Sequence, residues 1–213
     1  MKIALIGATG FVGSKVLAEA LQRAHPVSAL LRNPARLAPQ PGVAVHAVDV
    51  ADAEQVGRAV AGHDAVVSAF NAPRGNPEFH AIYVNAVRAI IDGVKRSGVK
   101  RLLLVGGAGS LFVAPRVQLV DTPQFPAEYR TEAQAAREAL DMIRDEATLD
   151  WSFISPAPIL APGQRTGRFR LGGDRVLMNG DKPGNISVED LAVAIVDELE
   201  TPRHLRQRFT LAY

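Results

Sequence analysis

Cysteine is absent from the 213 residues, so disulfide frameworks, thiolate metal sites, iron–sulfur clusters and cysteine nucleophiles are excluded. Aromatic residues are scarce, at 6% of the chain, and the 24 Lys and Arg nearly balance the 22 Asp and Glu. A net charge of +2 indicates no nucleic-acid-binding surface. Long apolar runs are missing too, since the first run, Ile3–Ile6, stops at Gly7. We therefore expect neither a signal peptide nor a membrane span, and a cytoplasmic location.

The composition is otherwise that of a folded chain, because 47% hydrophobic residues exclude global disorder and provide for a sizeable core. Short apolar runs alternate with segments whose apolar residues recur at helical spacing. This alternation predicts an α/β fold with a doubly wound parallel sheet and right-handed crossovers. We expect strands at 3–6, 27–31, 43–50, 65–70, 101–105, 151–154 and 209–213, and helices at 10–24, 53–61, 79–96, 131–144 and 185–199.

Two segments break this rhythm. Residues 106–131 contain Gly, Pro, Asp and Thr and are predicted as a loop. Residues 156–184 are rich in Gly and Pro, and we place them outside the main sheet as a small C-terminal lobe near the substrate cleft. Ser187 is a candidate N-cap of the last helix, with Asp190 three residues further on. We expect a single domain over residues 1–213.

A glycine-rich turn joins the first expected strand to the first expected helix, where Gly7, Gly10 and Gly13 form the pattern G-x-x-G-x-x-G. In this context Gly7 permits a tight turn, Gly10 lets the backbone approach a pyrophosphate, and Gly13 lets the helix pack closely on the strand. The helix N-terminus then offers unpaired N–H groups to the phosphates. A glycine turn kept for packing is the alternative, but the agreement of position, strand and helix favours a dinucleotide site.

The end of the second strand bears on which dinucleotide binds. Proteins that prefer NAD usually place an acidic residue there, whereas this chain has Arg32 and then Arg36. These guanidinium groups suit a 2′-phosphate and favour NADP(H) over NAD(H), although both are also typical of solvated surface cations. Asp49, at the end of the third strand, either lies beside the adenine or caps the next helix.

The carboxyl ends of the fourth and fifth strands are expected to complete the cleft, since ligands of open α/β sheets bind beyond these ends. Ser68, Ala69 and Phe70 end the fourth strand, and the segment Gly106–Ser110, which includes Gly107, ends the fifth. Small residues at these positions leave room for a ribose and a nicotinamide. Ordinary loop glycine is the weaker alternative.

Several motifs spread over nearly the whole chain together point to a known family: Gly7–Gly13, Arg32–Pro34, Gly106–Ser110, Asp150–Ala157, Pro162–Gly167, Ile186–Ala192 and Arg206–Thr210. Through them the sequence resembles an atypical short-chain dehydrogenase/reductase. More narrowly, it is similar to the NmrA-like bacterial group often called NADH-flavin reductase, which is related to biliverdin-IXβ/flavin reductase. The glycine turn is shared by many proteins, and the later motifs are more specific to this group.

The resemblance implies a Rossmann fold with a bound nicotinamide dinucleotide. It also implies which residues contact the dinucleotide, namely Gly7, Thr9, Gly10, Phe11, Val12, Arg32, Asp49, Val50, Ala69, Phe70 and Gly107. By the same resemblance, Ser155, Pro156 and Ala157 lie near the nicotinamide.

The catalytic groups of the family are only partly present. Most short-chain dehydrogenases use a Ser and a Tyr-x-x-x-Lys helix, in which the Lys lowers the pKa of the Tyr. Ser110 stands at the position of the family serine and Tyr129 is the candidate tyrosine, but Ala133 occupies the lysine position. The related flavin/biliverdin reductase has a His after its sixth strand, where this chain has Pro158. Tyr129 is therefore either a substrate-side donor or a residue that packs where the loop meets the helix.

Other polar residues carry weaker signals. The five His residues are scattered without ligand spacing, so no metal site is expected. His80 and Tyr83 on the long helix either face the cleft or lie partly exposed. The expected lobe has a basic stretch that either holds a flavin phosphate or carboxylate or is a solvated hairpin. Its residues are Arg165, Arg168, Arg170 and Arg175.

Three functions are weighed, in order of preference. The first is an NAD(P)H-dependent reductase with a flavin or quinone-like acceptor, because hydride passes directly between the two rings and solvent can supply the proton. The second is an NmrA-like redox sensor, which binds the dinucleotide and a protein partner without turnover. The third is a nucleotide-sugar epimerase or dehydratase, which needs the Tyr–Lys pair and a larger C-terminal domain. We expect a small-molecule substrate and neither a nucleic-acid nor a membrane partner.

Overall fold

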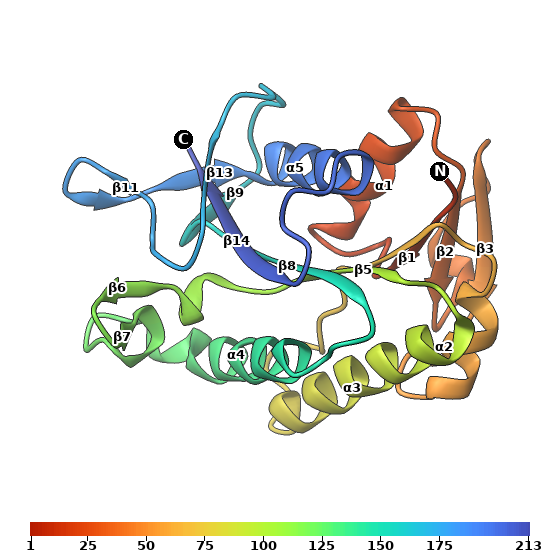
Figure 1. Ribbon diagram of the computed structural model, residues 1–213, viewed down its shortest axis with the longest axis horizontal. Helices are drawn as coiled ribbons and strands as arrows, with labels where there is room; N and C mark the ends of the chain where they lie inside the picture. Colours follow the sequence, from red (N-terminus) through yellow and green to blue (C-terminus); the bar gives the residue numbers. More distant parts are fainter.

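An eight-stranded sheet runs through the middle of the molecule (Figure 1). The computed structural model describes residues 1–213. In spatial order the strands are β3 (Val43–Ala47), β2 (Val27–Leu31), β1 (Ile3–Ile6), β4 (Ala65–Ser68), β5 (Arg101–Val105), β8 (Asp150–Pro156), β14 (Gln207–Ala212) and β10 (Arg170–Gly172). Every neighbouring pair is parallel except β14 with β10. The chain moves outward from β1 first to β3 and then the other way from β4 to β14, which is the doubly wound Rossmann arrangement that the sequence predicts.

Helices cover both faces of this sheet (Figure 1). One face carries α1 (Gly13–Gln22) and α5 (Val188–Glu200), and the other carries α2 (Ala53–Val60), α3 (Phe79–Ser97) and α4 (Arg130–Arg144). Two hydrophobic clusters of nearly equal size, with 25 and 24 buried residues, fill the two interfaces. The central strands are therefore buried on both sides, which is why they occur as continuous apolar runs in the sequence.

Short strands extend from the carboxyl end of the sheet, on the left in Figure 1. They form three small pairs: β6 (Phe112–Ala114) with β7 (Val117–Gln118), β9 (Ile159–Ala161) with β13 (Asn185–Ser187), and β11 (Met178–Asn179) with β12 (Lys182–Pro183). Single turns of 3-10 helix occur at Pro34–Arg36, Ala108–Ser110, Leu119–Asp121 and Ala127–Tyr129. These connections surround the edge of the sheet at which ligands of this fold bind.

The N-cap predicted for the last helix is confirmed. The Ser187 side chain accepts a hydrogen bond of 3.0 Å from the Asp190 N–H, which satisfies one of the free donors of the first turn of α5. The helix α2 begins in the same way, because the Asp52 carboxylate accepts from the backbone N–H groups of Glu54 and Gln55. Asp49 is therefore not the cap of this helix.

The prediction for residues 156–184 needs correction, because the segment is not wholly outside the main sheet. Its strand β10 pairs with β14, so that Leu171 lies opposite Leu211 at the edge of the eight-stranded sheet. The loop predicted at 106–131 also contains the β6–β7 hairpin. Both elements are short. The strand β10 is paired only through β14, which is distant in the chain, whereas β6 and β7 pair with each other across a local turn.

Some predicted boundaries also shift. The first helix begins at Gly13 rather than at residue 10, because the preceding residues form the glycine turn. The third strand ends at Ala47 rather than at residue 50, where the chain bends toward α2.

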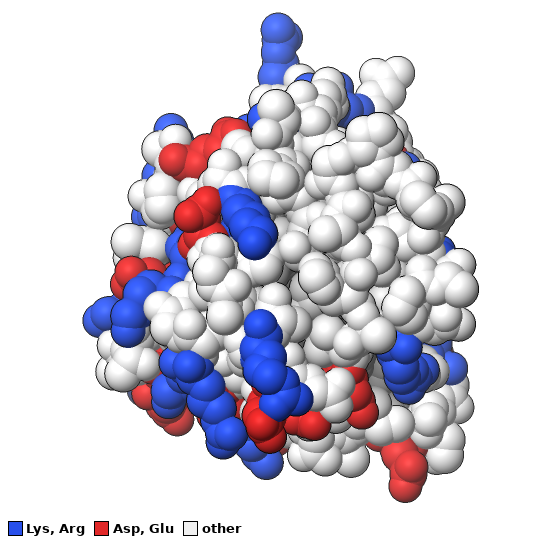
Figure 2. Space-filling model, turned by 90° about the vertical axis from the view of Figure 1, so that its right-hand side faces the viewer, with Lys and Arg blue, Asp and Glu red and all other residues white.

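The surface seen from the right-hand side of Figure 1 is mixed in charge. Basic and acidic side chains lie next to one another over its left and lower parts, and uncharged atoms cover much of its centre and right (Figure 2). This face does not present the continuous basic stripe that follows a nucleic-acid backbone. None of the helices combines the length and the apolar character needed to cross a lipid bilayer.

Candidate functional site

The glycine turn between β1 and α1 is a tightly packed unit. Gly7 has a φ of +84°, which favours glycine, and a Cβ there would lie 2.5 Å from the carbonyl oxygen of Ala69. A Cβ on Gly13 would lie 2.0 Å from the carbonyl oxygen of Gly7. The N–H of Gly10 donates to that same oxygen at 2.9 Å. The turn can therefore form only without side chains at its two ends, and packing alone requires Gly7 and Gly13.

The outer part of the turn leaves backbone donors free. The N–H groups of Phe11 and Val12 have no acceptor within the protein, and they lie at the N-terminus of α1. Gly10 and Phe11 are exposed, while Thr9 and Val12 are half-buried. Free N–H groups and the positive end of a helix dipole together attract an anion. The local geometry thus fits a phosphate group, in addition to its packing role.

Arg32 and Arg36 lie just beyond the end of β2. Both side chains are exposed, and neither forms an ion pair or a hydrogen bond within the protein. The Asn33 carboxamide between them accepts a hydrogen bond of 3.1 Å from the Ala35 N–H and caps the 3-10 turn that carries Arg36. Two positively charged side chains without protein partners therefore lie just after the carboxyl end of β2.

The carboxyl end of β3 is less open to a ligand than expected. The Asp49 carboxylate is exposed but accepts a hydrogen bond of 3.0 Å from the Ala51 N–H, and the Asp49 N–H donates to Gln55 at 3.1 Å. Val50 is half-buried and packs against the hydrophobic core. These contacts shape the connection between β3 and α2.

An aromatic stack borders the carboxyl end of β4. Ser68 is buried, and its hydroxyl accepts a hydrogen bond of 3.4 Å from the Phe70 N–H. The Phe70 ring stacks on Tyr83 with a centroid distance of 6.1 Å, and Tyr83 stacks on Phe79 at 5.9 Å. Burial raises the pKa of the Tyr83 phenol to about 12, so this tyrosine stays neutral at physiological pH. Ala69 and Phe70, both half-buried, place an apolar surface beside the glycine turn.

The turn after β5 places Ser110 away from solvent. Ser110 is 2% exposed, and its hydroxyl accepts a hydrogen bond of 3.3 Å from the Arg208 guanidinium. Arg208 also binds the Asp174 carboxylate through its Nε at 2.6 Å. Burial lowers the pKa of Arg208, and the contact with Asp174 opposes this effect. Gly107, in contrast, is half-buried and adds no side chain to the turn after β5.

The second catalytic candidate, Tyr129, lies where a 3-10 turn passes into α4. Its side chain is 48% exposed, and its hydroxyl has no hydrogen-bond partner in the protein. Four residues on, Ala133 is buried, and its Cβ would lie only 2.6 Å from a Cβ placed on Gly109. The helix therefore meets the turn after β5 at the position of the family lysine, and the contact leaves no room for a long side chain.

The end of β8, with Ala157 after it, is inaccessible to solvent and is called the wall below. Ser155, Pro156 and Ala157 are all buried. The Ser155 hydroxyl has no hydrogen-bond partner, and neither has that of Thr210, which lies opposite it on β14. Both hydroxyls are shielded from solvent, so neither is open to a ligand in this arrangement.

The four arginines of the basic stretch in residues 165–175 do not form a single cluster of free cations. Arg165 binds Glu19, and Arg170 binds the backbone carbonyl oxygens of Met178 and Tyr213. Arg168 and Arg175 are exposed, without side-chain partners. Two of the four guanidinium groups are thus used inside the protein, which argues against a single phosphate-binding cluster.

The structure brings the predicted cofactor residues to one edge of the sheet, because they follow the carboxyl ends of β1 to β5 and β8. Sequence reasoning missed the contacts of Tyr83, Arg208 and Glu19. For Glu19 the sequence offered one indication of burial, because this charged residue falls three residues after the apolar Val16 and so lies on the apolar side of α1.

His80 is part-exposed and pairs with Glu138 of α4 at 3.2 Å. No group of three His, Asp or Glu side chains comes together in a way that could hold a metal ion.

Comparison with known proteins gives a family that matches residues 7–202 of this chain and is described as NAD(P)H-binding. The match starts at the glycine turn and ends just after α5, so it spans both the free N–H groups and the closed wall at the end of β8.

Three solved structures are similar over their full length. A protein from Burkholderia pseudomallei named as a candidate exported protein is 45% identical, with a TM-score of 0.89 and complete coverage of both chains. A candidate epimerase from Bacteroides thetaiotaomicron is 43% identical, with a TM-score of 0.92 over 100% of this chain and 96% of that one. A candidate NADH-flavin reductase from Streptococcus pneumoniae is 32% identical, with a TM-score of 0.88 over 100% and 99% of the two chains.

Proposed function

This chain belongs to the NAD(P)H-binding family, and we propose that it is an NAD(P)H-dependent reductase that passes hydride to a flavin or quinone-like acceptor. The similarity to a candidate NADH-flavin reductase from Streptococcus pneumoniae supports this activity. The observation that carries the proposal is a glycine turn with free backbone N–H groups together with a Ser110 and a Tyr129 that lack the family's lysine partner.

The turn between β1 and α1 fits the dinucleotide. The free N–H groups of Phe11 and Val12 would hold the pyrophosphate, and Gly10 adds no side chain that would keep it away. Phe70 and Gly107 would border the nucleoside on the inner side. When bound, the reduced nicotinamide supplies a hydride, and the protein orients the two rings and excludes competing reactions.

The acceptor side has few means of moving a proton. Ser110 is buried against Arg208, and a guanidinium stays protonated and cannot act as a base. Four residues after Tyr129 the chain has Ala133 in place of the family lysine, and Ala133 packs against Gly109. Reduction of a flavin or a quinone tolerates this lack, since solvent can protonate the product. Alcohol oxidation and sugar epimerisation depend on a positioned acid–base group and fit the cleft less well.

NADP(H) is the preferred cofactor in this proposal. Arg32 and Arg36 are exposed cations without protein partners, and no acidic residue follows β2 to bind the ribose hydroxyls. The name of the Streptococcus pneumoniae relative gives NADH instead, so the preference is a property to be measured on this chain.

The first experiment is a fluorescence titration with NADPH and NADH, followed by oxidation of each at 340 nm with FMN, FAD, riboflavin or a quinone. We expect binding of both cofactors, tighter binding of NADPH, and oxidation that requires both protein and acceptor. Reactions without protein measure the direct reduction of each acceptor. Absence of dinucleotide binding would refute the proposal, because the proposed reaction takes its hydride from NAD(P)H.

A redox sensor is the second candidate, favoured by the same lack of a proton relay. It would bind the dinucleotide tightly, show no turnover with flavins or quinones, and require a protein partner. An epimerase, the name given to the Bacteroides thetaiotaomicron relative, ranks third because of the contact between Ala133 and Gly109. Conversion of a nucleotide sugar without net oxidation of cofactor would reverse this order.

A cytoplasmic location is part of the proposal and is open to a direct test. The name of the Burkholderia pseudomallei relative describes an exported protein. Fractionation of cells that express this chain, with detection in the soluble and secreted fractions, decides between the two locations.

A further inference from the structure

The segment Pro162–Arg168, called the strap below, lies against the first turn of α5 and contains no helix or strand. Side chains of α5 and its N-cap hold its backbone. The Gly163 N–H donates to the Glu189 carboxylate at 2.9 Å, and the Gln164 carbonyl accepts from the Ser187 hydroxyl at 2.8 Å. The Asp190 carboxylate receives further hydrogen bonds from the backbone N–H groups at 166 and 167, each 2.8 Å long. A loop held at so many points is a fixed element rather than a mobile one.

Asp190 is the central anchor. It is fully buried and also accepts hydrogen bonds from the hydroxyls of Thr166 and Tyr213. Burial alone would raise the pKa of Asp190, but these hydrogen bonds lower it below its ordinary value. The carboxylate therefore remains charged, and the strap is held to the first turn of α5 under ordinary conditions.

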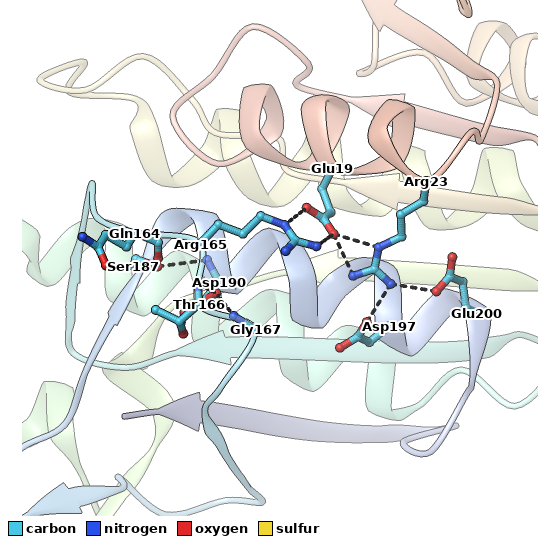
Figure 3. A network of polar contacts seen from close by, with 10 residues as sticks. All are labelled: Glu19, Arg23, Gln164, Arg165, Thr166, Gly167, Ser187, Asp190, Asp197 and Glu200. Carbon is cyan, nitrogen blue, oxygen red and sulfur yellow. Dashed lines mark hydrogen bonds and ion pairs between the residues drawn. The ribbon is translucent and has the colours of Figure 1, made fainter.

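One side chain of the strap reaches further, to the helix α1. Arg165 binds the Glu19 carboxylate through Nε at 2.7 Å and through Nη2 at 2.8 Å, as Figure 3 shows. Glu19 is only 4% exposed, and its pKa is lowered first of all by the hydrogen bonds from Arg165. A bidentate pair of this kind fixes both distance and orientation. It joins two segments that lie 146 positions apart in the chain.

The same carboxylate has a second partner that does not touch the strap. Arg23, one turn further along α1, binds Glu19 at 2.7 Å and also binds Asp197 and Glu200 of α5, each at 2.7 Å (Figure 3). Arg23 thus ties α1 to α5, whereas Arg165 ties the strap to α1. Replacing one arginine or the other therefore removes one of these two connections and leaves the other in place.

The strap follows β8 and β9 in the chain. The chain leaves the buried end of β8, forms β9, and enters the strap at Pro162. At the other end of the network, Glu19 belongs to α1, the helix that begins directly after the free N–H groups of Phe11 and Val12. The pair between Arg165 and Glu19 therefore ties the segment that follows β8 and β9 to the helix α1.

We propose that Arg165 is a positioning residue, which holds the strap and the β8–β9 wall at a fixed place relative to the dinucleotide-binding helix. This inference rests on the proposed reductase function. A wall at a fixed distance from the nicotinamide presents the acceptor ring in the geometry that hydride transfer needs, and displacement of the wall slows the reaction with the acceptor.

The test compares Arg165→Met with the control Arg23→Met, since each removes one guanidinium from Glu19. For Arg165→Met we expect amide hydrogen exchange in the strap to rise about tenfold or more, because its backbone opens more often. We expect kcat/KM for the flavin or quinone to fall about tenfold, with the dinucleotide Kd changed less than about twofold. Arg23→Met should lower the midpoint of thermal unfolding but leave strap exchange and kcat/KM near the original values.

Arg165→Lys supplies a second check, because a lysine restores the charge without the bidentate geometry and should rescue only part of kcat/KM. Equal effects of Arg165→Met and Arg23→Met would overturn the proposal, since both would then report general destabilisation. Unchanged strap exchange in Arg165→Met would also overturn it. If the original protein binds dinucleotide but reduces no acceptor, the reductase function fails, and strap exchange still decides whether Arg165 positions the segment.

Discussion

Replacement of Arg32 tests the cofactor preference most directly. Arg32 follows β2, is exposed, and has no carboxylate of the protein as a competing partner. A hydrogen bond to a charged group contributes ~1.5–3 kcal/mol, and solvent exposure puts a 2′-phosphate contact at the lower end of this range. Because ~1.4 kcal/mol is a factor of ten in Kd, we expect Arg32→Gln to weaken NADPH binding about tenfold. NADH has no 2′-phosphate, so its Kd should change less than about twofold.

The charge-reversed variant Arg32→Glu should have a larger effect. A carboxylate repels the 2′-phosphate of NADPH and can accept hydrogen bonds from the ribose hydroxyls of NADH, as the acidic residue of NAD-binding proteins does. Fluorescence titration with both cofactors at low and at high salt measures the preference. The NADPH contact of the original protein should weaken with salt, because exposed charges are screened.

Arg88→Gln is the matched control, since Arg88 is an exposed arginine of α3 without an ion pair and its replacement removes the same charge. Equal weakening of NADPH and NADH by Arg32→Gln would refute the phosphate contact, and so would unchanged binding of both. A selective loss that Arg88→Gln reproduced would show that net charge, rather than a contact at the end of β2, sets the preference.

Three further predictions concern the turn, the missing lysine and acid stability. Gly13→Ala should abolish dinucleotide binding in titrations and lower the thermal midpoint, because its Cβ would lie 2.0 Å from a carbonyl oxygen; intact binding would contradict this. Ala133→Lys should lower stability in urea unfolding and create no alcohol dehydrogenase activity, because Ala133 packs against Gly109, and a gain of that activity would count against the contact. Burial raises the pKa of Glu146, but hydrogen bonds led by that from Lys95 lower it to about 2 from 4.5. Its stabilisation is complete above pH 4.5 and is lost as pH falls through about 2, so Glu146→Gln should reduce the loss of stability over that interval, and an unchanged slope would exclude this role.

The parts of the fold that the sequence predicts are those decided locally or by burial. The strands β1, β2, β4 and β5 are buried on both faces, so their apolar runs alone identify them. The glycine turn is predictable for the same reason, because a strand, three glycines and a helix follow one another. Ser187 could be assigned as a cap since its acceptor role depends only on neighbouring residues.

The parts that escaped prediction depend on contacts between distant segments. The strand β10 has three residues and gains its place from pairing with β14. Ser110 stands at the family position, yet its environment is set by Arg208, which lies 98 positions away. The partner of Glu19 is likewise a distant arginine of the strap. Local sequence patterns carry no information about such pairings.

The environments of the hydroxyl groups bear on the proposed class of acceptor. Ser110, Ser155 and Thr210 are buried, and the phenol of Tyr83 is kept neutral by burial. Tyr129 is exposed, but Ala133 packs against the turn after β5 where a lysine would otherwise stabilise a phenolate. A substrate that must lose a proton to the protein during hydride transfer would therefore find no prepared base. A flavin or quinone draws its proton from water after the hydride arrives, so the proposed reduction of such an acceptor needs none of these hydroxyl groups as a base.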